Sequence, residues 1–62
     1  MTLEEAFEAI RDHYNGDFNK TLRWFYYENL LLGNIRPMEM IINGRTNKLI
    51  KFIENTLEEN QR

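Results

Sequence analysis

The chain has 62 residues and a net charge of −2, a length that allows one small domain with a thin hydrophobic core. Cysteine and serine are absent and His13 is the only histidine, which excludes disulfide bonds, thiolate or His-rich metal sites, and the Ser-His-Asp and Cys-His catalytic arrangements. We therefore expect a protein that is not an enzyme and that uses no cofactor or metal.

The sequence contains no long run of like-charged residues and no long run of apolar residues. No apolar run approaches the roughly 18 residues that span a membrane, and the acidic N-terminus is unlike a signal peptide. The small net charge lacks the basic excess of a dedicated nucleic-acid binder. We expect a soluble, cytoplasmic protein without membrane contact. The initial Met, followed at once by a helix-capping sequence, favours a whole protein over an excised domain.

The first predicted element is an amphipathic helix over residues 3–14. Thr2 and Glu5 form the T-x-x-E pattern of a capping box. Apolar side chains then follow at spacings of four, three and four, which places them on one helical face. They are Leu3, Phe7, Ile10 and Tyr14. The pair Asn15-Gly16 ends this helix, because Gly accepts the left-handed conformation common there.

A second helix is predicted over residues 18–28, with Asp17 as its N-cap. Phe18, Leu22 and Phe25 continue an apolar face. Residues 29–36 fit neither a helical nor a strand period, and we interpret them as a loop that buries some of its three leucines. Any of these leucines that stays outside would form an apolar patch of the kind that marks interfaces.

Two further helices are predicted, over 37–43 and 47–59. Pro37 suits the first turn of a helix, and Leu49, Phe52 and Ile53 recur at helical spacing. Asn43-Gly44 between apolar runs also permits a β-hairpin of residues 38–42 and 45–50. The second of these segments does not alternate and continues as a helical pattern to Leu57, which favours the helical alternative. The absence of Val also favours an all-α class.

The expected fold is therefore all-α, a single domain over residues 1–62 with four short helices around one core. The predicted core has one apolar set from each helix and one leucine from the loop. It consists of Leu3, Phe7, Ile10, Phe18, Leu22, Phe25, Leu32, Ile41, Leu49, Phe52 and Ile53.

The order of residues in the middle of the chain is distinctive. Leu22-Arg23-Trp24-Phe25 is followed by Glu28-Asn29 and by Leu32-Gly33. Then come Arg36-Pro37-Met38-Glu39-Met40-Ile41 and Ile42-Asn43-Gly44-Arg45, and Leu49, Phe52 and Ile53 close the pattern. Over about residues 17–56 this order resembles the toxin-binding domain of Xre/MbcA/ParS-type antitoxins. Arg36 stands where that family usually has Ser or Thr, and Asn34-Ile35 replaces a Gly-rich link.

The resemblance implies a function in binding a partner toxin, often of the RES type that degrades NAD, and in covering the route to its active site. Full antitoxins of this family carry an upstream helix-turn-helix segment, and only sixteen residues precede Asp17, the N-cap of the second predicted helix. DNA binding is therefore not implied. An inhibitor encoded by a mobile element, using such a toxin-binding domain against a host system, would have the same sequence features.

The predicted contact surface combines the loop, its flanks and the basic side of the last helix. Apolar anchors with a charged rim are typical of protein interfaces. The candidate residues are Tyr27, Leu30, Leu31, Asn34, Arg36, Arg45, Lys48 and Lys51. Arg45, Lys48 and Lys51 form a stripe that also permits a small nucleic-acid-binding module, although three charges support it weakly. Helix 3–14 could instead supply a homodimer contact.

Overall fold

The computed structural model describes the backbone of residues 1–60 and the side chains of residues 1–57. Four α-helices follow one another, with a short 3-10 helix, η1, between the second and third. Their bounds are α1 Leu3–His13, α2 Phe18–Tyr26, η1 Leu30–Leu32, α3 Pro37–Ile42 and α4 Thr46–Asn60. Residues 1–60 contain no strand beyond an isolated bridge between Asn29 and Ile35. The all-α class is confirmed, and the hairpin alternative for residues 38–50 is wrong.

Local hydrogen bonds determine where α1 begins and ends. The backbone N–H of Glu5 donates to the Thr2 hydroxyl at 3.2 Å, and the Glu5 carboxylate accepts from the Thr2 backbone N–H at 2.8 Å. This capping box lowers the pKa of the Glu5 carboxyl, chiefly through the backbone N–H of Thr2. At the other end Asn15 and Gly16 are left-handed, with φ of 56° and 83°. The tight turn sends the chain back along α1.

Side chains on both sides of that turn hold α1 and α2 together. The Asp17 carboxylate accepts from the Lys20 backbone N–H at 3.0 Å, which caps α2. Arg11 donates from Nε to the Gly16 carbonyl at 3.3 Å, and its guanidinium carbon lies 5.8 Å from the centre of the Phe18 ring. The helix ends at Tyr26, two residues before the predicted end, because Tyr27 already has extended dihedrals.

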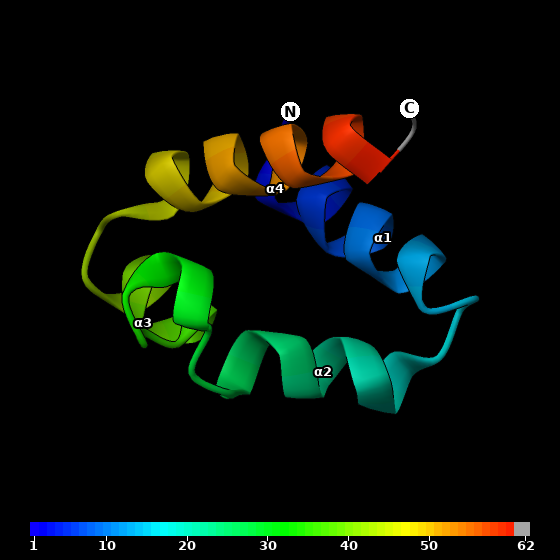
Figure 1. Cartoon of the computed structure of the whole chain (residues 1–62), viewed down its shortest axis with the longest axis horizontal. Coiled ribbons are helices and arrows are strands. Elements are labelled where there is room, and N and C mark those ends of the chain that lie inside the picture. The colour runs from blue at the N-terminus through cyan, green and yellow to red at the C-terminus, as the bar shows by residue number, and fades with distance from the viewer. Residues whose placement is uncertain (61–62) are drawn as a thin grey trace.

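The helices form a closed ring of contacts. α4 packs on α1 and α3, and α2 packs on the same two helices from the opposite side. Figure 1 shows α4 and α1 side by side above α2, with α3 at one end of the molecule. The first and last helices of the chain are therefore in direct contact, and the core lies between the two layers.

The core takes apolar side chains from all four α-helices. Its buried members are Ala6, Ile10, Phe25, Met40, Leu49 and Ile53. Pairs four residues apart on α1 and α4 face inward together, as a 3.6-residue period requires. Thr21 is the buried polar side chain in this region, and its hydroxyl donates to the Asp17 carbonyl at 2.8 Å. The buried hydroxyl is thereby satisfied within its own helix.

The predicted core is partly corrected. Phe18 is 49% exposed, because it is the first residue of α2 and its ring lies at the rim, edge-on to Phe7 with ring centres 6.0 Å apart. The smaller Thr21 occupies the interior one turn later. Leu3 and Leu22 are half-buried outside the central cluster, whereas the other predicted members belong to it or pack against it. Ala6 and Met40 were not among the predicted core residues.

Candidate functional site

The loop after α2 is an ordered turn rather than an irregular connection. Asn29 donates from its backbone N–H to the Ile35 carbonyl at 3.1 Å, and its own carbonyl accepts from Leu32 and Asn34, both at 3.0 Å. The Asn29 side chain accepts from the Leu31 backbone N–H at 2.9 Å. Gly33 and Asn34 are left-handed, with φ of 78° and 63°. We call residues 29–35 the leucine turn.

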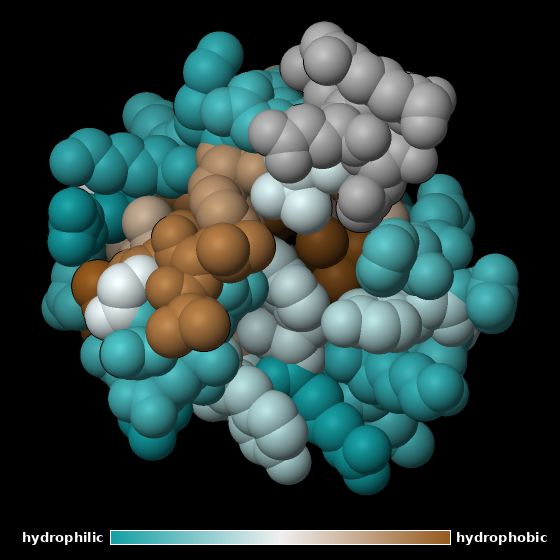
Figure 2. Space-filling view, in the orientation of Figure 1, coloured by the Kyte–Doolittle hydropathy of each residue, from teal (hydrophilic) through white to brown (hydrophobic). Residues whose placement is uncertain are grey.

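This turn separates its three leucines. Leu32 is half-buried and packs against the core, as predicted. Leu30 and Leu31 are 78% and 76% exposed. Figure 2 shows a brown, hydrophobic patch over the part of the molecule where Figure 1 places η1 and α3. An apolar pair is thus held outside by a hydrogen-bonded backbone, in the way that a rigid binding surface presents its anchors.

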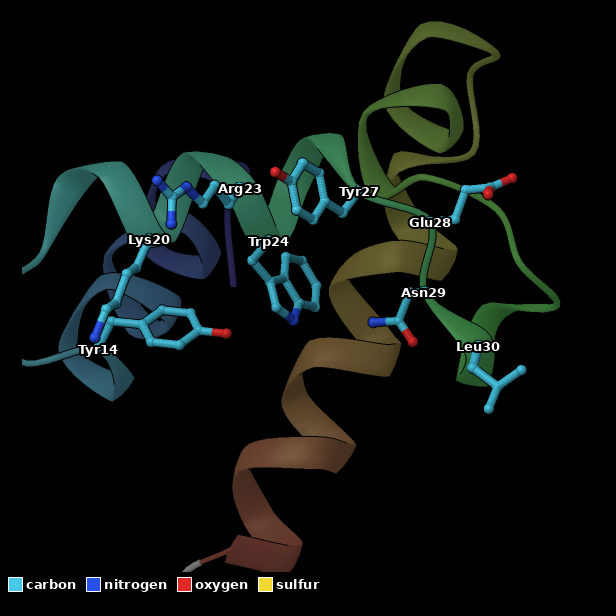
Figure 3. A pocket seen from close by; sticks show the side chains of 8 residues that line it. All are labelled: Tyr14, Lys20, Arg23, Trp24, Tyr27, Glu28, Asn29 and Leu30. Carbon is cyan, nitrogen blue, oxygen red and sulfur yellow. The ribbon is translucent and has the colours of Figure 1, made fainter.

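An open groove of about 420 Å³ lies beside the leucine turn. We call it the aromatic groove, and its wall combines three residues of α2 with Tyr14, just after α1, and with residues 27–30. Its lining residues are Tyr14, Lys20, Arg23, Trp24, Tyr27, Glu28, Asn29 and Leu30 (Figure 3). The volume falls within the range of small-ligand and anchor pockets. The Trp24 ring also packs edge-on against Phe25, with ring centres 5.0 Å apart, which ties the groove wall to the core.

A smaller and more enclosed cavity of about 110 Å³ adjoins this groove. The two share Tyr14, Trp24 and Asn29 among their lining residues. Leu31 also lines the smaller cavity, together with Ile10 and Ile53 of the core. The surface around η1 therefore borders both the open groove and a smaller cavity whose lining reaches the core.

On the other side of Tyr27 lies a second open hollow of about 590 Å³, lined by Tyr26, Tyr27, Glu28 and Arg36. Tyr27 is 66% exposed and belongs to both hollows. Arg36, the N-cap of α3, donates to the Glu39 carboxylate three residues along the chain at 3.3 Å, and both side chains are about half exposed. Such a pair contributes little to stability and leaves Arg36 available at the surface.

The structure divides the eight predicted contact residues into two groups. Tyr27, Leu30, Leu31 and Arg36 line the adjoining hollows described above, and the exposed Asn34 belongs to the same turn. A second group, on the N-terminal half of α4 and just before it, is exposed but lines none of these hollows. It consists of Arg45, Lys48 and Lys51.

Sequence reasoning missed part of the groove wall. Lys20, Arg23 and Trp24 are spaced by three residues and one residue, which places two cations and one aromatic ring on one side of α2, and the predicted contact residue Tyr27 follows directly after the helix. That spacing is readable from the sequence. Tyr14 and Asn29 join them only through the packing of α1 and the course of the turn.

The described residues contain no group of three His, Asp or Glu side chains placed to hold a metal ion. None of the described helices has both the length and the hydropathy that crossing a membrane would require. Comparison of the chain with protein-family models, with curated proteins and with solved structures found no match in any of the three.

Proposed function

We propose that this chain is a non-catalytic protein-binding module that contacts its partner through the leucine turn and Tyr27. The observation that carries the proposal is the exposure of Leu30 and Leu31 by more than three quarters on a backbone held by hydrogen bonds. Burying such a side chain in an interface contributes about 1.5–3 kcal/mol, which the isolated chain leaves unused. The neighbouring Tyr27 is also exposed, and tyrosine is one of the residue types enriched at binding hot spots.

The proposed action of the module is antitoxin-like: it neutralises a toxin or another enzyme by covering the route to its active site. Steric occlusion requires a rigid surface with apolar anchors and no reactive side chain. The resemblance of residues 17–56 to antitoxin toxin-binding domains makes a RES-type toxin the first partner to test. The rigid leucine turn and the hollows on either side of Tyr27 support this proposal.

The experiment starts with affinity capture from the source cells at about 0.3 M salt, which screens loose electrostatic contacts. The captured protein is then purified and titrated calorimetrically with the wild-type chain and with Leu30→Ser and Leu31→Ser. Ile42→Ser is the matched control, because Ile42 is 75% exposed and lines none of the hollows beside the leucine turn.

We expect one-to-one binding by the wild-type chain, with each leucine variant at least about tenfold weaker and the Ile42 variant unchanged. For a RES-type toxin, NAD consumption should stop at one equivalent of the wild-type chain. Equal affinities for all variants would refute the leucine turn as the contact surface. Binding without loss of the partner's activity would refute occlusion while leaving the binding function intact.

A further inference from the structure

The aromatic groove has an unequal balance of hydrogen-bond donors and acceptors. Lys20 and Arg23 lie one turn apart on its α2 wall, both exposed. Neither forms an ion pair with another of the residues whose side chains the structure describes. Both cations are therefore open to an anion from outside the chain, at the end of the groove near Tyr14, where Figure 3 shows both side chains directed away from Trp24.

Neutral donors add to these charges. In Figure 3 the Trp24 indole nitrogen, the Tyr14 hydroxyl and the Asn29 amide nitrogen all lie toward the interior of the groove. The Asn29 orientation is fixed, because its oxygen accepts from the Leu31 backbone N–H at 2.9 Å. Glu28 supplies the carboxylate of the lining set, and Figure 3 shows it directed away from Trp24. Such a groove fits a ligand that brings acceptors.

We propose that the aromatic groove receives an acidic segment of the partner protein, in which an Asp or Glu stands close to an apolar or aromatic side chain. The carboxylate would be held by Arg23 and Lys20, since Arg can donate two parallel hydrogen bonds to a carboxylate. The apolar neighbour would lie against Trp24 and Leu30. The inference deepens the proposed protein-binding function and rests on it, because it names the chemistry of the partner.

A single-stranded nucleic acid also combines negative charge with flat rings, but the surroundings favour a peptide. Two cations give a weak electrostatic contribution to phosphate binding, and the chain as a whole carries a net charge of −2. The groove continues into Leu30 and Leu31, whose aliphatic side chains pack well against the apolar side chains of a peptide. A sugar-phosphate backbone has no such apolar side chains to pack against them.

The test uses the whole chain and two double variants of equal charge change. The groove variant, Lys20→Glu with Arg23→Glu, reverses the charge of the two groove cations. The α4 variant, Lys48→Glu with Lys51→Glu, reverses the charge of two cations with the same spacing on α4, outside the groove. Circular dichroism checks that both variants fold. The probe is a displayed library of random dodecamer peptides selected on the immobilised wild-type chain. An enriched peptide is then synthesised with and without its acidic residues changed to the matching amides.

Binding of each peptide is followed by the fluorescence of Trp24, which is the only tryptophan and lines the groove. We expect the selection to enrich acidic residues beside apolar ones. The amide peptide and the groove variant should each weaken binding by at least about tenfold, and the α4 variant by less than about twofold. Selection of peptides without acidic residues, or equal affinities for the two double variants, would overturn the inference.

Two further outcomes identify other occupants and would also overturn it. One is steeply salt-dependent quenching of Trp24 by an oligothymidylate, with no response to any acidic peptide. The other is a dimer in sedimentation that dissociates in the groove variant, which would assign the groove to a second copy of the chain. If the captured partner binds the groove variant normally but fails with Leu30→Ser, the proposed function stands and only the acidic-segment inference falls.

Discussion

Leu49 and Ile53 on α4 are completely buried, whereas Leu30 and Leu31 on η1 are more than three quarters exposed. The four side chains are nearly equal in size and hydropathy, yet their backbones place them in opposite environments. The first pair belongs to the core that holds α4 against α1 and α3, and the second contributes almost nothing to that core. The comparison teaches that stability and binding are carried by separate apolar sets, so mutations should separate the two properties.

The largest effect is expected from Leu49→Ala. The substitution leaves a cavity between helices and should lower the free energy of unfolding by about 2–5 kcal/mol. A core of this size rarely supplies more than about 3–5 kcal/mol, so the variant should be largely unfolded at room temperature. Urea denaturation followed by circular dichroism measures the change. A Leu49→Ala variant that unfolds at the same urea concentration as the wild type would contradict the view that the buried pair carries the stability.

Gly33→Ala tests the backbone that keeps the two leucines outside. Gly33 has a φ of 78°, and an added Cβ would meet no atom within 4 Å, so the cost comes from the left-handed conformation alone. We expect a loss of about 1–2 kcal/mol in thermal or urea unfolding. Gly33→Asn is the matched control, because Asn tolerates this conformation better. Equal stability of the Ala and Asn variants would contradict the backbone explanation.

Thr2→Ala removes the N-cap of α1 without changing either apolar pair, and should cost about 1 kcal/mol in urea unfolding. The effect should be intermediate between those of the core and of the exposed leucines. Thr2→Ser, which keeps the hydroxyl, should restore most of the loss. A Ser variant as unstable as the Ala variant would show that the methyl group, not the cap, carries the effect.

The same capping box predicts a pH dependence. The pKa of Glu5 is lowered in the folded chain from its ordinary value of 4.5, chiefly by the backbone N–H of Thr2. The ionised Glu5 therefore stabilises the fold above pH 4.5, and this contribution is lost as the pH falls through the folded pKa. Compared with Glu5→Gln, the wild type should lose stability on acidification. A stability difference that stays constant with pH would contradict this assignment.

The smallest effect on stability is expected from the double variant Leu30→Ser with Leu31→Ser. Both side chains are exposed, so the free energy of unfolding should change by less than about 0.5 kcal/mol. The same change should weaken partner binding most. Thermal melting alongside the calorimetric titration gives both values on one sample. A strongly destabilised double variant would show that the fold of the turn depends on these side chains. Stability and binding would then not be carried by separate apolar sets.

The sequence predicts the helices well where a local signal decides them. Thr2, Asp17 and Pro37 mark helix starts through capping or backbone geometry, and the structure begins helices at each. Prediction from the sequence fails where tertiary packing decides which side chains are buried. Phe18 follows the apolar spacing of α2 but lies at the rim, while Thr21 occupies the interior because its hydroxyl bonds within the helix.

The candidate site is predictable to a similar extent. A run of three leucines before Gly33 indicates that some stay outside, but which of them do depends on the hydrogen bonds of Asn29. The two cations and the Trp24 ring on one side of α2 are readable from their spacing. Their meeting with Tyr14 is not, because that residue comes from the end of α1 and reaches the groove only through the tight turn at Gly16.

The contact between α1 and α4 has a consequence for the kinetics of folding. Short turns let α1 and α2, or α3 and α4, find each other locally, whereas joining the first helix to the last closes a loop that contains nearly the whole chain. The entropy of that closure grows only with the logarithm of its length but must be overcome before the core is complete. We expect the docking of α1 on α4 to be the late step, so that weakening it speeds unfolding more than it slows folding.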